Sequence, residues 1–562
     1  MTSPSAPHDP QSGPSTAPPP LSPSAYTDTF ARDHLPAAEL WPGLAFELPE
    51  LRYPQRLNCG AELLDATAER FGADRPAFHS PGEPPWTYGE LKATVDRIAH
   101  VLTDDLGVVP GNRVLLRGPT TRHLAACWLA VMKAGGVAVT VLAQQRSAEL
   151  ATMCEIARVG HALCDARAVD DLLKAEVPGL RIATFGGDGP DDLLSLAAGK
   201  PDAYEAVETA SDDVALIAFT SGTTGRPKGC MHFHRDVLAI ADTFSRHVLR
   251  PTPDDVFAGS PPLGFTFGLG GLVIFPLRAG ASALLLEQAG PRQLLPAIAE
   301  HRVSVLFTAP TAYRAMLAEM AAGPHDVSSL RRCVSAGENL PAATWEAWHE
   351  ATGLRIINGI GATELLHIFI SAADEAIRPG TTGVPVPGWQ ARIVDAAGAE
   401  LPDGEPGLLA VRGPVGCRYL ADERQTTYVR HGWNVTGDTY VREPDGYFRY
   451  LARADDMIIS AGYNIPGPEV EDALLKHPDV TEVAVVARPD EARGQIAVAH
   501  VVLRPGARRD PEALREFVKA ELVPYKCPRV IEFLDALPRT ATGKLQRFRL
   551  REPGGGAAPD AE

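Results

Sequence analysis

The chain has 562 residues, of which 45% are hydrophobic and 22% charged, and its formal net charge is −17 at pH 7. This length exceeds one ordinary core and indicates several domains, while the acidic balance argues against a protein that binds nucleic acid through bulk basicity. The eight cysteines are scattered without a C-x-x-C pair, which argues against a zinc site or a disulfide framework and favours reduced thiols in a cytoplasmic protein.

The two ends of the chain differ from the rest in composition. Residues 1–24 are rich in Pro and Ser, and residues 551–562 are rich in Gly and Ala, so both are predicted to be loose tails. The first stretch has no apolar core and does not resemble a secretory signal. Runs of about eighteen apolar residues are absent from the sequence, so we expect no membrane partner.

Helical and strand patterns alternate over residues 54–185, which predicts parallel sheets covered by helices. The expected helices are 88–106, 121–134 and 148–159, and the expected strands are 113–117, 137–142 and 162–166. A second series follows an apolar strand at 214–219. Its expected strands are 281–286, 303–308 and 354–357, and its expected helices are 294–301 and 344–351.

Near Thr382 the sequence pattern changes to short strands separated by Gly and Pro turns, with strands expected at 391–394 and 407–412 among others. This pattern predicts a small β-rich subdomain. After Leu451 an α-β-β-α-β order indicates a compact α+β unit, with helices over 470–477 and 511–522 and strands over 482–487, 496–503 and 530–534. The predicted fold is therefore α/β and α+β. A large domain (25–452) with two βα-layered sheet subdomains and the β-rich subdomain precedes a small C-terminal domain (453–550).

A loop rich in glycine and hydroxyl residues follows the strand at 214–219. It contains Thr220, Ser221, Gly222, Thr223, Thr224, Gly225, Arg226 and Lys228. Glycines allow the backbone to approach an anion, hydroxyls donate hydrogen bonds and the two cations supply charge. The order differs from the common G-x-x-x-x-G-K-[ST] phosphate loop because Gly229 follows Lys228. We interpret it as a polyphosphate loop, and a polar surface loop is the alternative.

Four further motifs are each ambiguous alone. A glycine-rich turn, Asn358-Gly359-Ile360-Gly361, is expected after the strand at 354–357, where Thr363 could donate to a phosphate and Glu364 could hold Mg²⁺. Asp438, expected after a tight turn in Trp433-Asn434-Val435-Thr436-Gly437-Asp438, could accept two ribose hydroxyls. The alternatives are a surface glutamate and a turn aspartate.

The other two motifs lie near the start and the end of the C-terminal unit. Arg453-Ala454-Asp455-Asp456-Met457 with Gly462-Tyr463-Asn464 could equally be a solvated charged linker. Lys544 follows a predicted Thr-Gly turn in Pro538-Arg539-Thr540-Ala541-Thr542-Gly543-Lys544, where it would be a mobile point cation or an ordinary solvated lysine.

Together, in this order and spacing, the five motifs resemble the adenylate-forming superfamily of acyl-CoA synthetases, peptide-synthetase adenylation domains and firefly-type luciferases. The resemblance covers roughly 54–548. Residues 360–369 (IGATELLHIF) and 260–271 (SPPLGFTFGLGG) are similar to the benzoate-CoA ligase group. The latter stretch, with 455–464 (DDMIISAGYN), is most similar to 2-aminobenzoate-CoA ligases.

The resemblance implies a two-step reaction with ATP, Mg²⁺ and coenzyme A. A carboxylate attacks the α-phosphate of ATP, giving acyl-AMP and pyrophosphate, and the CoA thiol then displaces AMP. It implies that the 220–228 loop wraps the β- and γ-phosphates, that Thr363 touches the α-phosphate, that Glu364 holds Mg²⁺ and that Lys544 bridges the carboxylate and the α-phosphate. The further nucleotide-binding residues that it implies are Gly337, Glu338, Asn358, Gly359, Asp438 and Arg453.

The resemblance also implies that the C-terminal domain rotates about Asp455 between the two steps and brings Gly462 and Tyr463 to the thiol channel. The expected acyl pocket suits a flat aryl acid; it consists of Phe265, Phe267, Gly268, Gly270, Gly361, His367 and Ile368. His367 could hydrogen-bond an ortho amino or hydroxyl group, whereas core packing is the alternative for it and for the aromatic residues.

Two positions depart from the superfamily pattern. Ile360 stands where many members have an aromatic residue that stacks on adenine, and Ile459 stands where many ligases have a lysine. The function that the resemblance implies is activation of 2-aminobenzoate or a related substituted benzoate to its CoA thioester. The alternatives are a stand-alone enzyme that loads a carrier protein and a catalytically silent nucleotide-binding protein of the same fold. A homodimer is left open.

Overall fold

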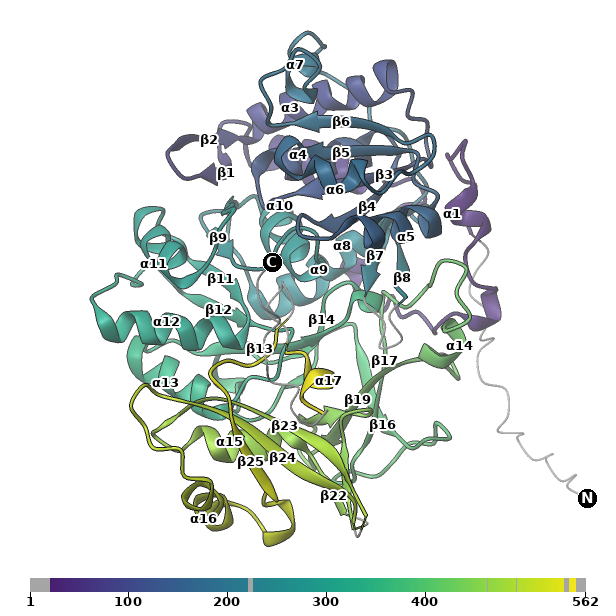
Figure 1. The fold of residues 1–562 in the computed structure, drawn as a ribbon. Coiled ribbons are helices and arrows are strands. Elements are labelled where there is room, and N and C mark those ends of the chain that lie inside the picture. Colours follow the sequence, from purple (N-terminus) through teal and green to yellow (C-terminus); the bar gives the residue numbers. More distant parts are fainter. Residues whose placement is uncertain (1–20, 221–225, 462, 492, 540–544, 552–562) are drawn as a thin grey trace, which may run out of the picture.

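The computed structural model describes residues 21–220, 226–461, 463–491, 493–539 and 545–551. Figure 1 shows a large N-terminal part that contains three sheets and a small C-terminal part that contains a fourth. The predicted α/β and α+β class, with a large domain followed by a small one, is therefore confirmed.

The first sheet has six strands in the order β6-β5-β3-β4-β7-β8 and is parallel except for β8, which pairs antiparallel with β7. Its inner strands β4 and β5 are buried along almost their whole length, as expected for a parallel sheet that helices cover on both faces. The strands are β3 (Arg113–Gly118), β4 (Val137–Leu142), β5 (His161–Asp165), β6 (Arg181–Phe185), β7 (Val214–Thr220) and β8 (Lys228–Phe233), and the helices of this region are α3 (Tyr88–His100), α4 (Arg122–Lys133), α5 (Ser147–Ala157), α6 (Val169–Leu173) and α7 (Leu193–Ala198).

The second sheet has nine strands in the order β15-β14-β13-β12-β11-β9-β10-β1-β2. Its strands are β1 (Pro76–Ser80), β2 (Glu83–Thr87), β9 (Val256–Gly259), β10 (Ser282–Leu284), β11 (Val305–Thr308), β12 (Arg332–Ser335), β13 (Ile356–Gly361), β14 (Ile368–Ser371) and β15 (Val384–Pro385). Its helices are α2 (Cys59–Phe71), α8 (His234–Ile240), α9 (Thr266–Leu269), α10 (Phe275–Ala279), α11 (Pro291–Glu300), α12 (Pro310–Ala322) and α13 (Ala342–Thr352).

One hydrophobic cluster joins the two sheets through the helices between them. It contains Val114 of β3, Leu238 of α8 and Phe257 of β9, all fully buried. Figure 1 shows α8, α9 and α10 in this central position. The segments that leave both sheets toward their common boundary are therefore attached to one core.

The predicted β-rich subdomain is a five-stranded sheet in the order β16-β17-β19-β18, with β20 paired to β19. Its elements are β16 (Gln390–Val394), β17 (Gly407–Arg412), α14 (Gln425–Tyr428), β18 (Val429–Arg430), β19 (Trp433–Arg442) and β20 (Phe448–Arg453). Every pair in this sheet is antiparallel.

The C-terminal part has its own core and its own five-stranded sheet. Its elements are β21 (Ile458–Ser460), β22 (Tyr463–Ile465), α15 (Gly467–Leu475), β23 (Val480–Asp490), β24 (Gly494–Leu503), α16 (Pro511–Glu521), β25 (Val530–Phe533) and α17 (Arg547–Leu550). The predicted α-β-β-α-β order corresponds to α15 through β25, and the hairpin β21–β22 precedes it.

The predicted tails extend too far into the fold. Ser22 and Ser24 precede the first helix, α1 (Phe30–Asp33), and both are bound to the residues just before β7. Ser22 Oγ donates to Asp212 at 3.2 Å, and Ser24 Oγ donates to Asp213 at 2.5 Å. At the other end, Arg551 donates to the Asp455 carbonyl at 3.2 Å. These residues find charged or polar partners that composition alone does not reveal.

Two expectations from composition can be compared with the structure. All eight cysteines are buried and unpaired, as expected for reduced structural thiols. Among the helices that the structure describes, none has the length and apolar character that crossing a membrane requires.

Candidate active site

The β7–β8 hairpin carries the predicted polyphosphate loop. Thr220 is the last residue of β7 and lies opposite Lys228, the first residue of β8. Residues 221–225 lie outside the described residues. On the return side, Arg424 donates to the carbonyl of Arg226 at 3.0 Å, so the chain that leads into Lys228 is held by the segment before α14.

Lys228 and Glu364 are brought together although 136 residues separate them in the sequence. Their charged atoms lie 3.5 Å apart. The hydroxyl of Tyr419 lies between them: it accepts a hydrogen bond from Lys228 Nζ at 2.7 Å and donates one to Glu364 Oε1 at 2.5 Å. Tyr419 is not among the residues predicted from sequence, because no local signal distinguishes this buried tyrosine from one in the hydrophobic core.

The glycine-rich turn predicted at Asn358–Gly361 is wrong, because these residues continue β13. The tight bend comes later, at the 3₁₀ helix η7 (Thr363–Leu365). His232 Nε2 donates to the Thr363 carbonyl at 2.8 Å. Burial lowers the pKa of His232 to about 4, so the ring is neutral and holds the start of η7 through one N–H.

Gly337 and Glu338 follow β12, next to Asn358 and Gly359 of β13. The two strands are parallel, and Ser335 lies opposite Asn358, so the residues that follow β12 lie beside the second half of β13. Burial raises the pKa of Glu338, and the positive charge of Arg539 at 3.7 Å opposes that rise. Four of the predicted nucleotide-binding residues therefore lie beside one another near the carboxyl end of β12.

Asp438 and Arg453 face each other across β19 and β20, and their side chains form an ion pair at 3.1 Å. Asp438 lies within β19 instead of after a tight turn, which corrects the prediction. Gly437 before it has φ +78°, and a Cβ there would lie 3.1 Å from the Arg453 guanidinium. Burial raises the pKa of Asp438, Arg453 opposes the rise, and Glu364 adds to it.

The donor set around Glu364 fits a magnesium ion that is bound together with phosphates. Groups of three or more His, Cys, Asp or Glu side chains that could hold a metal by themselves do not occur among the described residues. Mg²⁺ commonly takes one or two carboxylates and completes its coordination with substrate phosphates and water. A single buried carboxylate beside Lys228 is consistent with that arrangement.

His367 lies in an aromatic cage. The ring centroids of Phe267 and Phe275 are 5.5 Å and 4.5 Å from its own, and those of Phe244 and Phe307 are 5.6 Å and 6.2 Å away. Neither ring nitrogen meets the full geometry of a hydrogen bond with a described residue, although the backbone of Phe267 lies close enough to favour the protonated ring. Burial outweighs that contact and lowers the pKa of His367 to about 3. The site therefore holds a neutral imidazole of which at most one nitrogen is engaged, by the Phe267 backbone.

Three of the predicted pocket glycines allow close packing. A Cβ on Gly270 would lie 2.4 Å from His367 Cδ2, one on Gly361 would lie 2.9 Å from the His367 backbone, and one on Gly268 would lie 2.2 Å from the Pro262 carbonyl oxygen. Ile368 is buried under Gly359. Phe265 and Phe267 are half-buried, as residues that line an open pocket would be.

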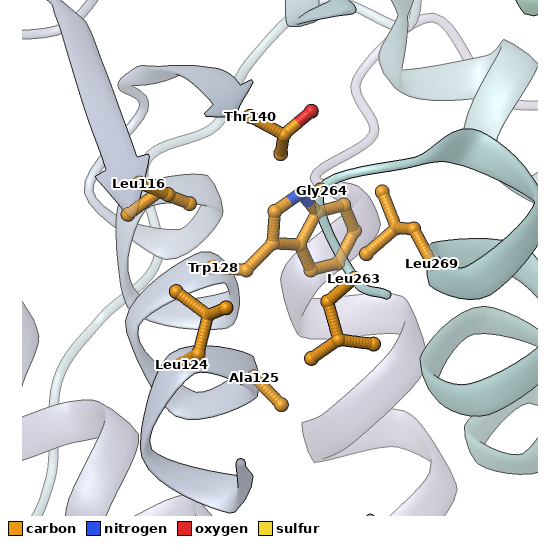
Figure 2. A pocket seen from close by; sticks show the side chains of 8 residues that line it. All are labelled: Leu116, Leu124, Ala125, Trp128, Thr140, Leu263, Gly264 and Leu269. Atoms are coloured by element: carbon orange, nitrogen blue, oxygen red, sulfur yellow. The ribbon is translucent and has the colours of Figure 1, made fainter. Parts of the chain in front are cut away.

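A small cavity of about 10 Å³ lies between α4 and the segment from Leu263 to Leu269, which carries Phe265 and Phe267. Figure 2 shows the Trp128 ring between Leu263, Leu269 and the α4 side chains Leu124 and Ala125. Its lining is almost entirely apolar, and Leu263, Gly264 and Leu269 are its residues from this segment, so it is a packing gap and does not correspond to the predicted acyl pocket.

The hinge and thiol motifs lie away from the β7–β8 hairpin. Asp455 is in a turn between β20 and β21. Tyr463 is 54% exposed and stacks on Tyr525 at 4.5 Å, and Figure 1 shows β22 at the lower edge of the molecule. Ile459, which replaces a lysine of many ligases, is exposed. Gly462 and Lys544 lie outside the described residues.

Two family models match the chain. The model described as AMP-binding enzyme matches residues 64–419, and the model described as AMP-binding enzyme C-terminal domain matches residues 469–544. The first match includes Lys228, Glu364 and Tyr419.

Similar proteins include benzoate–CoA ligase of Thauera aromatica, which is 35% identical over 90% of this chain and 97% of its own length. Among solved structures, the anthranilate CoA ligase AuaEII in complex with anthranoyl-AMP has a TM-score of 0.85 at 32% identity, covering 90% of this chain and 98% of that one. A benzoate CoA ligase from Burkholderia xenovorans LB400 has a TM-score of 0.80 at 33% identity, covering 88% of this chain and all of that chain.

Proposed function

The chain belongs to the AMP-binding enzyme family and is an AMP-forming acid–CoA ligase, and from this premise we propose that its substrate is a benzoate with an ortho amino group. The coarser function, aryl-acid–CoA ligase, is supported by the benzoate–CoA ligase relatives. The finer one is supported by the residues around His367 and by the similarity to the anthranilate CoA ligase.

The proposed chemistry has two steps. A carboxylate oxygen of the acid attacks the α-phosphorus of ATP, the bond to the β-phosphate breaks, and pyrophosphate leaves. The CoA thiol then attacks the carbonyl carbon of the acyl-AMP, the thioester forms, and AMP leaves with the carboxylate oxygen while the thiol proton is released. The carboxylate is already nucleophilic, so the first step requires in-line positioning and charge neutralisation instead of a general base.

We assign the charged residues of the site to these needs. Lys228 neutralises phosphate charge, and Glu364 holds the magnesium ion, which withdraws electron density from the phosphates when bound. Asp438 accepts hydrogen bonds from the ribose hydroxyls while Arg453 fixes its carboxylate. Lys544 bridges the attacking carboxylate and the α-phosphate.

The observation that carries the choice of acid is the buried His367 ring, of which at least one nitrogen has no hydrogen-bond partner among the described residues. A buried polar group without a partner costs free energy, so such a group points to a ligand that completes its hydrogen bonds. A neutral imidazole can accept a hydrogen bond from an ortho amino group, and the surrounding phenyl rings fit a flat aromatic ring.

The experiment compares kcat/KM for 2-aminobenzoate, 2-hydroxybenzoate and benzoate in the wild-type protein and in His367→Leu. The leucine fills the cage with an apolar side chain that cannot form a hydrogen bond. We expect kcat/KM for 2-aminobenzoate to fall about tenfold or more relative to benzoate, because a hydrogen bond is lost only with the substituted acid. Benzoate is the internal control. An unchanged ranking of the three acids would remove His367 from substrate selection.

A further inference from the structure

The hydroxyl of Tyr419 has one partner of each charge, which is an unusual arrangement for a buried tyrosine. It accepts a hydrogen bond from Lys228 at 2.7 Å and donates one to Glu364 at 2.5 Å. The Lys228 ammonium also lies 4.6 Å from the centroid of the Tyr419 ring. The hydroxyl therefore sets the position of the ammonium and the carboxylate at the same time.

The fold fixes Tyr419 from both sides. The residues before and after it hydrogen bond to the backbone of β8, the strand that begins with Lys228, at 2.8 and 2.9 Å. Its own N–H donates to the side-chain oxygen of Gln425 at 2.9 Å, and Gln425 is itself buried and donates to the Cys417 carbonyl. Tyr419 is therefore attached to the same strand as Lys228, and its hydroxyl reaches out to η7.

Lys228 and Glu364 also touch directly, because Lys228 Nζ donates a long hydrogen bond to Glu364 Oε1 at 3.5 Å. A shorter ion pair would compete with a nucleotide, because the ammonium is needed on phosphate and the carboxylate on magnesium. The hydroxyl uses one donor of the ammonium and one carboxylate oxygen. Both described hydrogen bonds of Glu364 go to its Oε1 atom. Lys228 and Tyr419 therefore contact the same oxygen of the carboxylate.

We propose that Tyr419 is a positioning residue for acid activation, whose hydroxyl holds the Lys228 ammonium and the Glu364 carboxylate so that they do not close into a shorter direct ion pair and remain available to MgATP. This inference rests on the proposed role of Glu364 as the magnesium ligand. Tyr419 acts by organising charges before the nucleotide binds, so that less reorganisation is needed at the moment of reaction.

Tyr428 offers a matched control. It is half-buried next to Tyr419, with ring centroids 5.8 Å apart, and its ring lies 5.9 Å from the Lys228 ammonium. Its buried hydroxyl has no hydrogen-bond partner among the residues that the structure describes. Tyr428→Phe therefore removes a hydroxyl from the same region without removing a bond to Lys228 or Glu364.

The experiment measures the dissociation constant of MgATP by titration calorimetry in the full-length protein, together with kcat and KM for adenylation. We compare the wild type, Tyr419→Phe, Tyr428→Phe, Glu364→Gln and the double variant Tyr419→Phe/Glu364→Gln. We expect Tyr419→Phe to weaken MgATP binding about tenfold to a hundredfold, the range of a hydrogen bond to a charged group, and Tyr428→Phe to leave it unchanged. In the Glu364→Gln background the effect of Tyr419→Phe should shrink, because the two residues act together.

The outcomes separate the two claims. If Glu364→Gln leaves MgATP binding unchanged, the magnesium role in the proposed function fails. If Glu364→Gln weakens binding but Tyr419→Phe does not, the positioning role of Tyr419 is overturned. Two further outcomes would also overturn it, since each would indicate a general packing role. One is an equal loss of MgATP binding in Tyr419→Phe and Tyr428→Phe. The other is a loss in the double variant that equals the sum of the losses in Tyr419→Phe and Glu364→Gln.

Discussion

The guanidinium of Arg539 lies 3.7 Å from the carboxylate of Glu338. This ion pair links the C-terminal domain to the segment after β12, where the nucleotide is expected to bind. Arg539 also donates to Glu482 of its own domain at 2.6 Å. Lys544 follows Arg539 by five residues in the sequence, so the pair anchors the chain that leads to it. We propose that this orientation serves the adenylation step, because Arg539 contacts Glu338 while β22, which begins with Tyr463, lies at the lower edge of the molecule (Figure 1).

Breaking this link should slow the first half-reaction more than the second. Arg539→Ala is expected to lower acid-dependent ATP–pyrophosphate exchange about fivefold, the effect of a partly exposed ion pair. Conversion of supplied aryl-AMP to the thioester should change less, because that step needs the other orientation. Glu482→Gln is the control, since it removes only the contact within the C-terminal domain. Equal losses in both half-reactions would contradict an orienting role.

Lys544→Ala tests the residue that the sequence motif places at the reacting groups. We expect it to abolish ATP–pyrophosphate exchange while supplied aryl-AMP is still converted to thioester, because the cation is needed only when charge develops at the α-phosphate. Lys519→Ala is a matched control, as Lys519 is a surface lysine of the same domain paired with Glu516. Parallel loss of both half-reactions would remove Lys544 from this role.

Gly270→Ala should narrow the aryl pocket. The added Cβ would lie 2.4 Å from His367 Cδ2 and 2.8 Å from Nε2, in a cage with little room to relax. Overpacking of this kind costs about 1–3 kcal/mol, so kcat/KM for 2-aminobenzoate is expected to fall about tenfold or more. Gly189→Ala, where a Cβ meets nothing within 4 Å, should have no effect. Wild-type activity in Gly270→Ala would argue against a pocket at this position.

Buried histidines should make the protein less stable in mild acid. Burial lowers the pKa of His232 to about 4 and those of His234 and His367 to about 3. Below pH ~6.5 the unfolded chain binds protons that the folded chain does not, so each residue lowers the free energy of unfolding by about 1.4 kcal/mol per pH unit, down to its folded pKa.

The check is denaturant unfolding at pH 7, 6 and 5. In His367→Leu the dependence of the unfolding free energy on pH should decrease by about one proton between pH 6 and 5. The half-buried His325 provides the control variant His325→Leu. An identical slope in His367→Leu and the wild type would show that the imidazole is not buried in its neutral form.

The sequence predicted those parts of the fold that local patterns encode. Apolar runs such as 137–142 and 214–219 became β4 and β7 within a residue of the predicted limits, because strands buried on both faces carry an uninterrupted signal. Several helices, among them α2, α8 and α12, were not predicted. The hairpin β1–β2 was also missed, and β1 lies beside β10, which follows it by about 200 residues; such pairing has no local signature.

Two motif residues were assigned the wrong backbone for a shared reason. Glycines near Asn358 and Asp438 suggested turns, whereas Gly361 and Gly437 lie within strands where a side chain or backbone approaches closely. Tyr419 could not be found at all, because its importance comes from Lys228 and Glu364, which the tertiary fold brings to its hydroxyl. The sequence motifs identified the charged residues Lys228 and Glu364, whereas only the tertiary structure shows that the Tyr419 hydroxyl lies between them.

The most direct test of the central claim follows the oxygen atoms of the acid. The protein is incubated with ATP, CoA and 2-aminobenzoate whose carboxylate carries oxygen-18, and the products are analysed by mass spectrometry. Attack of the carboxylate on the α-phosphorus followed by thiol displacement predicts AMP with one oxygen-18 atom and unlabelled pyrophosphate. Unlabelled AMP, or label in phosphate or pyrophosphate, would contradict activation of the acid through an aryl-AMP intermediate.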